Sequence, residues 1–204
     1  MIQRRFVTSE LKDNKRSESA DIIALGREIL GIPQNANMRH DNIEVVSTTK
    51  EAFERGAEVV LTYTNANVRA VNEEQKVKSG APAIHPLFSV GDLIISKTNE
   101  QGKYYNGQIF KILSYNQAIN TSNGRLVTFR TSKDLEYNFD LAYGLTIHKS
   151  QGSEWDIVAY QPSELDTQNL AYVAVTRAKK KLIIVGDQIK AEYPADREWR
   201  QLNL

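Results

Sequence analysis

Cysteine is absent from the sequence, which excludes disulfide bonds and thiolate chemistry. The 3 histidines, at positions 40, 85 and 148, lie far apart along the chain, so we expect no metal site. No apolar run approaches the length needed to cross a bilayer, and residues 1–9 lack the apolar core of a secretory signal. These absences predict a soluble cytoplasmic protein.

An excess of charge of one sign is absent as well. The 26 Lys and Arg residues nearly balance the 25 Asp and Glu residues, which leaves a net charge of +1. This balance does not indicate an overall affinity for nucleic acid, although a local basic groove remains compatible with it. The 204 residues, 41% of them hydrophobic, are enough for one domain or for one domain with an insertion.

The most regular pattern lies in the last third of the chain. Two short apolar runs, Trp155–Tyr160 and Lys181–Val185, are typical of buried strands in a parallel sheet. Between them, the apolar residues of Asp166–Lys180 recur with a helical period. We expect Tyr143–Gly152 to begin as a helix and to continue as a loop. The predicted order is therefore helix start, loop, strand, helix and strand.

Two motifs in this stretch resemble those of a known family. TIHKSQGSEWD, from Thr146 to Asp156, resembles motif V of superfamily 1 DNA helicases, and YVAVTRAKKKLIIVGD, from Tyr172 to Asp187, resembles their motif VI. They stand in the family's order, one strand and a short loop apart, as in the UvrD-like, RecD-like and Dda-like enzymes. The resemblance implies an α/β fold: a RecA-like second helicase motor domain, of the P-loop NTPase type, built on a parallel sheet.

The resemblance assigns two arginines to ATP hydrolysis. Arg177, late in the predicted helix, matches the arginine finger of motif VI, a cation that stabilises charge on the transferred phosphate. LKDNKRS resembles motif IV, where an arginine at the position of Arg16 contacts the terminal phosphate. The alternative for Arg177 is a solvated basic helix end, favoured by the helix dipole. The alternative for Arg16 is a surface arginine before a helix.

The first 80 residues predict several further elements. A helix with Ser17 or Ser19 as its N-cap ends at Gly31–Pro33. Ile43–Val46 is interpreted as part of a surface connector, before a helix from Thr48. Glu58–Tyr63 predicts a buried strand.

The polar pair after this last strand is a candidate DNA contact. The related helicases have a Thr-Asn or Ser-Asn pair here, at the start of a helix that touches the DNA strand, and Thr64 and Asn65 match it. Free N–H groups at a helix N-terminus suit a phosphate, and both side chains add hydrogen-bond donors. An ordinary N-cap by either residue is the alternative, and it is compatible with a phosphate contact.

Motif V supplies the remaining candidates. The resemblance places Thr146 and His148 against the DNA backbone, which predicts binding without base preference. The resemblance places three further residues against the nucleotide: Gln151, Gly152 and Glu154. Of these, Glu154 would lie near the ribose. For His148, a structural histidine that bonds a backbone carbonyl is the alternative. Lys149 is expected to be exposed to solvent.

Residues 81–141 have a different pattern. Short alternating segments, with turn signals at Asn106-Gly107 and Asn123-Gly124 and a last segment at Leu135–Ala142, predict several short strands. They resemble the small Src-homology-3-like β-barrel inserted in the second motor domain of RecD-like and Dda-like helicases. We therefore expect a RecA-like domain in two segments, residues 1–80 and 142–204, interrupted by a barrel at residues 81–141.

Three tyrosines of the expected barrel are candidates for stacking on bases: Tyr104, Tyr105 and Tyr115. The alternative for each of them is a place in the barrel core.

The sequence shows no phosphate-binding G-x-x-x-x-G-K-[ST] loop and no acidic pair for magnesium, since its one Gly-Lys pair, Gly102-Lys103, lacks the earlier glycine. We therefore expect the C-terminal half of an ATP-dependent DNA helicase, inactive alone. A first motor domain with Walker A and B motifs, in a separate chain or lost by truncation, would bind most of the ATP and Mg²⁺. Family analogy gives 5′-to-3′ movement on single-stranded DNA. The alternative is a non-catalytic single-stranded-DNA-binding or regulatory module derived from a helicase.

Overall fold

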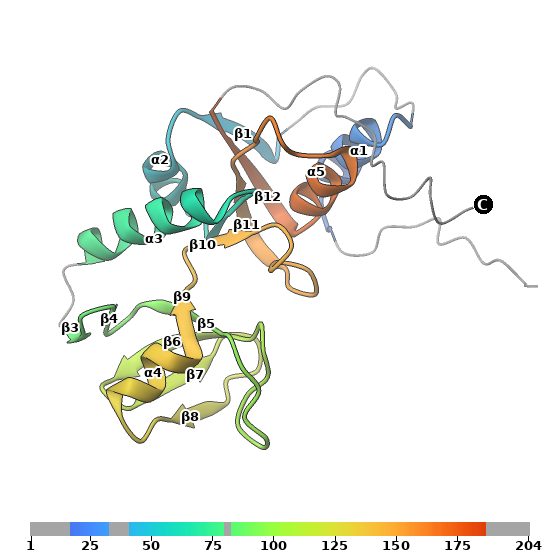
Figure 1. The fold of residues 1–204 in the computed structure, drawn as a ribbon. Coiled ribbons are helices and arrows are strands. Elements are labelled where there is room, and N and C mark those ends of the chain that lie inside the picture. Colours follow the sequence, from blue (N-terminus) through green and yellow to red (C-terminus); the bar gives the residue numbers. More distant parts are fainter. Residues whose placement is uncertain (1–16, 33–40, 80–82, 187–204) are drawn as a thin grey trace, which may run out of the picture.

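The computed structural model of the chain describes residues 17–32, 41–79 and 83–186 (Figure 1). Arg16 and the tail expected to form a helix, residues 194–204, lie outside these ranges.

A parallel five-stranded sheet, in the described residues, forms the upper unit of the molecule (Figure 1). Its strand order is β1-β12-β11-β2-β10. The strands are β1 (Ile43–Val46), β12 (Ala178–Val185), β11 (Trp155–Tyr160), β2 (Val59–Thr62) and β10 (Gly144–Thr146). Each neighbouring pair is parallel, with Val158 of β11 opposite Leu182 on one side and Val59 on the other. The expected α/β fold with a parallel sheet is confirmed.

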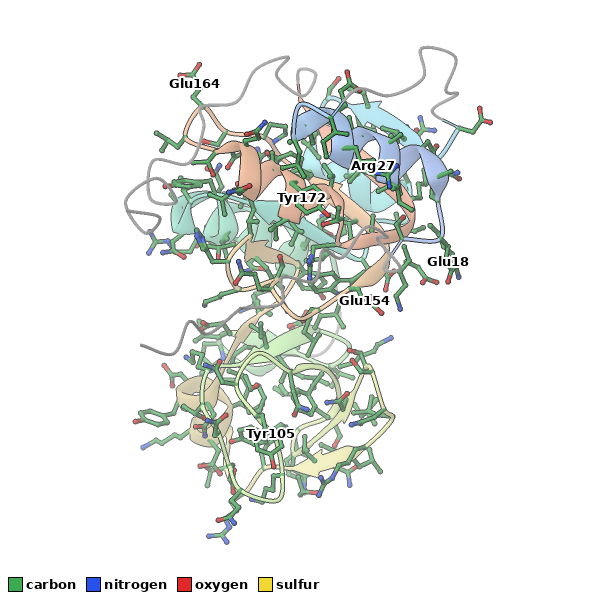
Figure 2. The ribbon with its side chains drawn as sticks, turned by 90° about the vertical axis from the view of Figure 1, so that its right-hand side faces the viewer. Glu18, Arg27, Tyr105, Glu154, Glu164 and Tyr172 are labelled. Carbon is green, nitrogen blue, oxygen red and sulfur yellow. The ribbon has the colours of Figure 1, made fainter. Side chains whose placement is uncertain are left out.

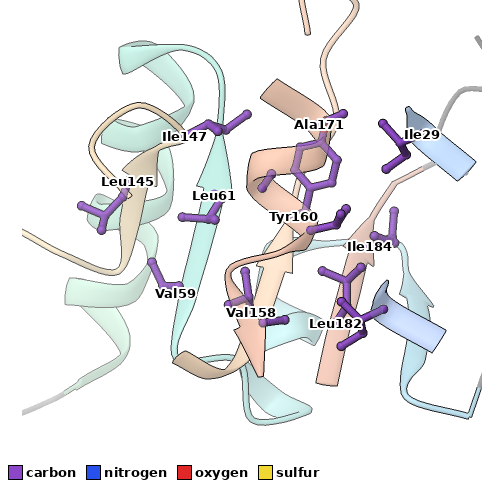
Figure 3. Close-up of a cluster of buried hydrophobic side chains, with 14 of the residues drawn as sticks. Ile29, Val59, Leu61, Leu145, Ile147, Val158, Tyr160, Ala171, Leu182 and Ile184 are labelled. Carbon is purple, nitrogen blue, oxygen red and sulfur yellow. The ribbon is translucent and has the colours of Figure 1, made fainter. Parts of the chain in front are cut away.

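Helices cover both faces of this sheet. On one face, α1 (Ala20–Ile29) and α5 (Gln168–Val175) bury their apolar residues against Val59 and Leu61 of β2 (Figure 3). On the other face, α2 (Thr49–Glu54) and α3 (Asn65–Ser79) enclose Val60 of the same strand. Because successive strand residues point to opposite faces, a strand covered on both sides must be apolar throughout. This explains the apolar runs within the central strands, which are residues 59–61, 158–160 and 182–185.

Three predictions for the elements of this unit were wrong. Ile43–Val46 is not a connector but edge strand β1, whose exposed Val45 hides the pattern of a buried strand. The start of motif V is strand β10 at the other edge, not a helix. The helix expected within Asp166–Lys180 is α5, which ends at Val175, because the basic run that follows already belongs to β12.

The lower unit is an antiparallel sheet inserted between α3 and β10 (Figure 1). Its strand order is β8-β7-β6-β5-β9. The strands are β5 (Leu93–Ser96), β6 (Ile109–Ser114), β7 (Gln117–Asn120), β8 (Leu126–Thr128) and β9 (Phe139–Leu141), preceded by a hairpin of β3 (Ala83–His85) and β4 (Phe88–Ser89). In the described residues β8 and β9 are the two edges and do not pair with each other. The Src-homology-3-like barrel and the domain boundaries therefore stay predictions.

Local chemistry explains one difference within this unit, and burial decides between the alternatives for the tyrosines. The segment from Leu135 was expected to be a strand, but α4 (Ser132–Asn138) occupies its first part, started by a capping box of Thr131 and Asp134. Tyr104 is 2% exposed and packs on the rings of Phe110 and Phe139, so it belongs to the core of the inserted sheet. The other two tyrosine candidates, Tyr105 and Tyr115, are exposed.

A buried asparagine joins the two units where the chain returns from the inserted sheet. Asn72 of α3 donates from Nδ2 to the carbonyls of Leu141 (3.2 Å) and Gly144 (3.4 Å), and its Oδ1 accepts from the Gly144 N–H at 2.8 Å. A Cβ at Gly144 would meet the Cβ of Val71 at 2.9 Å, so only glycine allows this approach. The start of β10 is thereby held against α3.

Candidate functional site

The motif V loop, residues 147–154, connects the two ends of the parallel strands. We call the side of the sheet at which the strands end the carboxyl edge, and the side at which they begin the amino edge. The loop leaves β10 at the carboxyl edge and enters β11 at the amino edge, so it runs opposite to the direction of the strands (Figure 1). Its middle is fixed from within, because the buried Ser150 donates from Oγ to the Ile147 carbonyl at 2.7 Å. The left-handed backbone of Gly152 (φ +90°) makes the final turn. The candidate DNA contacts and nucleotide contacts therefore occupy the two ends of one loop.

The carboxyl edge brings the four candidate DNA contacts together. Thr146 ends β10 beside Thr62, the last residue of β2, and Thr64 and Asn65 lie two and three residues beyond Thr62. Thr64 caps α3, because its Oγ1 accepts from the Asn67 N–H at 3.1 Å, so the N-cap prediction holds. Asn65 and His148 are exposed, whereas Thr146 is buried to 9% exposure.

A groove of ≈640 Å³ lies beside this edge, between α3 and the inserted sheet. Asn65, Thr146 and Lys149 line it from the upper unit, and Lys97 and Asp140 line it from the lower one. Lys149 is exposed as expected, but it also pairs with Asp140 at 3.7 Å. Lys97 and Asp140 were not predicted as site residues, since no motif marks them.

The amino edge carries the three nucleotide candidates in a second groove of ≈740 Å³. Gln151 and Gly152 are exposed in its wall, and Glu154 lies where the upper unit faces the lower one (Figure 2). The Glu154 carboxylate pairs with Lys179 Nζ at 2.8 Å, and this bond raises the pKa of the Lys179 ammonium above its ordinary value. Lys179 is a site residue that sequence reasoning missed, although the basic run of motif VI contains it.

Arg177 lies between α5 and β12 and is only 4% exposed. Its Nε donates to the Val173 carbonyl at 3.2 Å and its Nη1 to the Ser153 carbonyl at 3.1 Å. Its own carbonyl accepts from the Trp155 N–H at 3.1 Å. This burial excludes the alternative of a solvated helix end. The arginine of motif VI is bonded directly to the motif V loop.

The three lysines after Arg177 form a row of ion pairs on β12. Lys180 pairs with Asp156 at 2.6 Å, and Lys181 pairs with Glu44 of β1 at 2.6 Å. These acidic partners come from β11 and β1, the two strands that pair with β12 on either side. The row continues the Lys179–Glu154 pair along the amino side of the sheet.

The described residues contain neither a metal-binding cluster nor a helix suited to a membrane. No cluster of His, Asp and Glu side chains there could hold a metal ion. Within the same ranges, no helix is both long enough and apolar enough to span a membrane.

Comparison with known families agrees with this geometry. A family model described as the UvrD-like helicase C-terminal domain matches residues 141–185, from the end of β9 through β12. The chain is 33% identical over 168 residues to the RecD subunit of the RecBCD enzyme of Mycolicibacterium smegmatis. It is 31% identical over 117 residues to the ATP-dependent RecD2 DNA helicase of Deinococcus radiodurans. The chain contains a superfamily 1 helicase C-terminal domain.

This helicase domain accounts for part of each curated relative. The RecD match covers 78% of this chain and 29% of that protein, and the RecD2 match covers 53% and 16%.

Solved helicases share the fold. A Pif1 helicase from Bacteroides in complex with ADP-AlF3 and single-stranded DNA has a TM-score of 0.62 at 17% identity, covering 95% of this chain and 56% of that one. The Pif1 helicase of Candida albicans gives 0.60 at 14% identity, with coverage of 93% and 58%. At these identities the likeness concerns the fold of the helicase domain.

Proposed function

We propose that this chain provides the second motor half of an ATP-dependent DNA helicase. Its carboxyl edge binds the backbone of single-stranded DNA through Thr64, Asn65, Thr146 and His148. Its amino edge faces ATP and Mg²⁺ bound by a motor domain with Walker A and B motifs, in the same polypeptide or in another. Two relatives support this division: one is named an ATP-dependent DNA helicase, and a neighbour in fold was crystallised with a nucleotide complex and single-stranded DNA.

The observation that carries the proposal is the contact between the two motifs. The motif V loop follows Thr146 at the proposed DNA edge, and near its other end the Ser153 carbonyl accepts a hydrogen bond from Arg177. A displacement of the loop by DNA therefore changes the surroundings of the guanidinium. This supports a role in which DNA binding and hydrolysis influence each other.

The proposed finger has to leave its present partners to act. A phosphate offers charged oxygens in a bidentate geometry, and guanidinium bonds these more strongly than neutral carbonyls. ATP held by the partner domain thus competes with Val173 and Ser153 for Arg177. Gln151, Gly152 and Glu154 contact the nucleotide from the adjoining groove.

Arg16 joins Arg177 in this proposal. Ser17, the residue after it, donates from Oγ to the Lys179 carbonyl at 3.2 Å, and the Glu18 N–H donates to the same carbonyl at 2.9 Å. The chain that follows Arg16 thus lies beside the start of β12, next to Arg177. The two arginines act on the terminal phosphate as a unit, and 5′-to-3′ movement along the DNA belongs to the same proposal.

One observation favours a second candidate function, a single-stranded-DNA-binding or regulatory module without catalysis. Arg177 is buried and bonded to backbone carbonyls, as a purely structural arginine would be. The deciding experiment joins this chain, by fusion or in trans, to the first motor domain of a RecD-type relative and measures ATP turnover with and without single-stranded DNA. A motor half produces DNA-stimulated hydrolysis, whereas a binding module leaves the turnover of the partner unchanged.

A further inference from the structure

Asp140 of β9 lies between two lysines that come from different units. Its Oδ1 is 3.1 Å from Lys97 Nζ, and its Oδ2 is 3.7 Å from Lys149 Nζ. Lys97 follows β5 of the inserted sheet, whereas Lys149 belongs to the motif V loop. One carboxylate therefore bridges the two units, with each of its oxygens facing one ammonium group.

These three side chains are accessible from solvent. The exposed fraction is 35% for Lys97, 52% for Lys149 and 47% for Asp140. Ion pairs this exposed contribute little to stability and are screened by salt. An anionic ligand can therefore take the place of the carboxylate without a large loss of folding free energy.

The backbone holds all three residues in position. Asp140 pairs with Ile95 in the sheet, and the Lys97 N–H donates to the Asn138 carbonyl at 2.7 Å. The Lys97 ammonium also donates to the Glu136 carbonyl at 3.0 Å, and the Lys149 N–H donates to Thr146 Oγ1 at 3.2 Å. The backbones of the three residues are thus fixed, and both ammonium groups lie beside the Asp140 carboxylate before any ligand arrives.

The pair of lysines stands in the groove that contains the proposed DNA contacts. Lys97 and Lys149 line the ≈640 Å³ groove together with Asn65 and Thr146, and both also line an adjoining pocket of ≈330 Å³. The Asp140 carboxylate therefore lies where a DNA strand bound along the carboxyl edge would pass.

We propose that Lys97 and Lys149 bind a backbone phosphate of single-stranded DNA, and that Asp140 occupies this position until the DNA displaces it. The inference rests on the proposed function, because it extends the same DNA edge onto the inserted sheet. A phosphodiester carries one negative charge over two terminal oxygens, as a carboxylate does, so the exchange preserves the charge balance of the pair. Asp140 then acts as a built-in competitor that lowers the affinity for DNA.

The test measures binding of a labelled oligothymidylate to the full chain by fluorescence anisotropy at several salt concentrations. Asp140→Asn should raise the affinity by roughly twofold to fivefold, the range for one exposed ion pair. Lys97→Gln and Lys149→Gln should each lower the affinity and reduce the salt slope by about 0.7. Lys149→Arg keeps the charge and should keep the binding. Asp140→Asn should have no effect in the double variant Lys97→Gln/Lys149→Gln.

Matched controls remove the same charges elsewhere on the inserted sheet. Glu100→Gln takes away a partly exposed carboxylate paired with Lys103, and Lys111→Gln takes away an exposed lysine of β6 outside the groove. Glu100→Gln should not raise the affinity as Asp140→Asn does, and Lys111→Gln should not lower it as Lys97→Gln and Lys149→Gln do. Thermal unfolding of every variant shows that it is folded.

Each other outcome overturns a definite part of the argument. If Asp140→Asn lowers the unfolding temperature and leaves the affinity unchanged, the bridge only joins the two units. If Thr146→Val weakens binding and the lysine variants do not, the phosphate site is wrong and the proposed function stands. If the unmodified chain does not bind the oligothymidylate at low salt, the DNA edge of the proposed function fails with it.

Discussion

A 3.1 Å hydrogen bond joins Arg177 Nη1 to the backbone carbonyl of Ser153. The donor lies between α5 and β12, and the acceptor lies near the end of the loop that starts at the carboxyl edge of the parallel sheet. The Val173 carbonyl holds the other side of the guanidinium at 3.2 Å. The direction of this side chain therefore depends on the loop, and a change in either element alters what the arginine can reach.

Arg177→Ala should cut ATP turnover by roughly 10³-fold or more in a motor completed with a Walker A and B domain, the scale of arginine fingers. The apparent affinity for ATP should change less, because a finger acts mainly where charge builds in the transition state. Arg177→Lys should rescue little, since an ammonium cannot reproduce the planar fork of guanidinium. Steady-state kinetics with a coupled ATPase assay measures both parameters.

This experiment has two controls: a variant of a nearby lysine on β12, and the chain without the partner motor domain. Lys180→Ala, an exposed neighbour paired with Asp156, should keep most of the turnover, and the chain without its partner domain should not hydrolyse ATP. Turnover at the unmodified rate in Arg177→Ala would leave the arginine with a structural role only.

Thr146→Val should weaken binding of single-stranded DNA several-fold, because the change removes a hydroxyl at the carboxyl edge and keeps the shape of the side chain. The unmodified chain should bind in the non-specific range of roughly 10⁻⁴–10⁻⁶ M, with lower affinity at higher salt. Fluorescence anisotropy measures both effects. Thr128→Val, at an exposed position of β8, is the matched control. Equal binding by both variants would remove Thr146 from the DNA edge.

Asn72→Ala should lower the free energy of unfolding by about 1–3 kcal/mol, because it leaves buried backbone groups of Gly144 and Leu141 without this partner. Urea denaturation followed by circular dichroism measures the change. Gln117→Ala, exposed on β7, should stay within about 0.5 kcal/mol of the unmodified chain. A stability equal to that of this control would show that the asparagine does not hold the junction.

Tyr104 should make stability fall as pH rises above about 10. Burial, reinforced by a hydrogen bond to Glu100, raises the pKa of Tyr104 to about 12, whereas an unfolded tyrosine titrates near 10. The contribution of Tyr104 to the free energy of unfolding is complete below about pH 10. It is lost as the pH approaches about 12, because only the unfolded chain releases the proton between these two values. Urea midpoints at several pH values should fall less steeply in Tyr104→Phe than in Tyr115→Phe, an exposed control. If the urea midpoints of the two variants fell equally steeply with pH, Tyr104 would not be the tyrosine whose pKa folding raises.

The sequence alone determined the centre of the parallel-sheet unit. Residues 158–160 of β11 and residues 182–185 of β12 are buried on both faces, so each is a continuous apolar run that can be recognised without knowing which strands lie beside it. The family resemblance in motifs V and VI was also visible there, and the matched helicase domain confirms it.

The tertiary structure decided what depends on contact between distant segments. Edge strands β1 and β10 are short, so their pairing with β12 and β2, rather than their composition, makes them strands. For Arg177 the sequence left a solvated helix end as the alternative to the arginine finger, and only the fold, which buries the side chain against the Ser153 carbonyl, excludes that alternative. Lys97 and Asp140 belong to no motif, and they meet Lys149 of motif V only because the register of the inserted sheet and the path of the motif V loop bring all three to one groove.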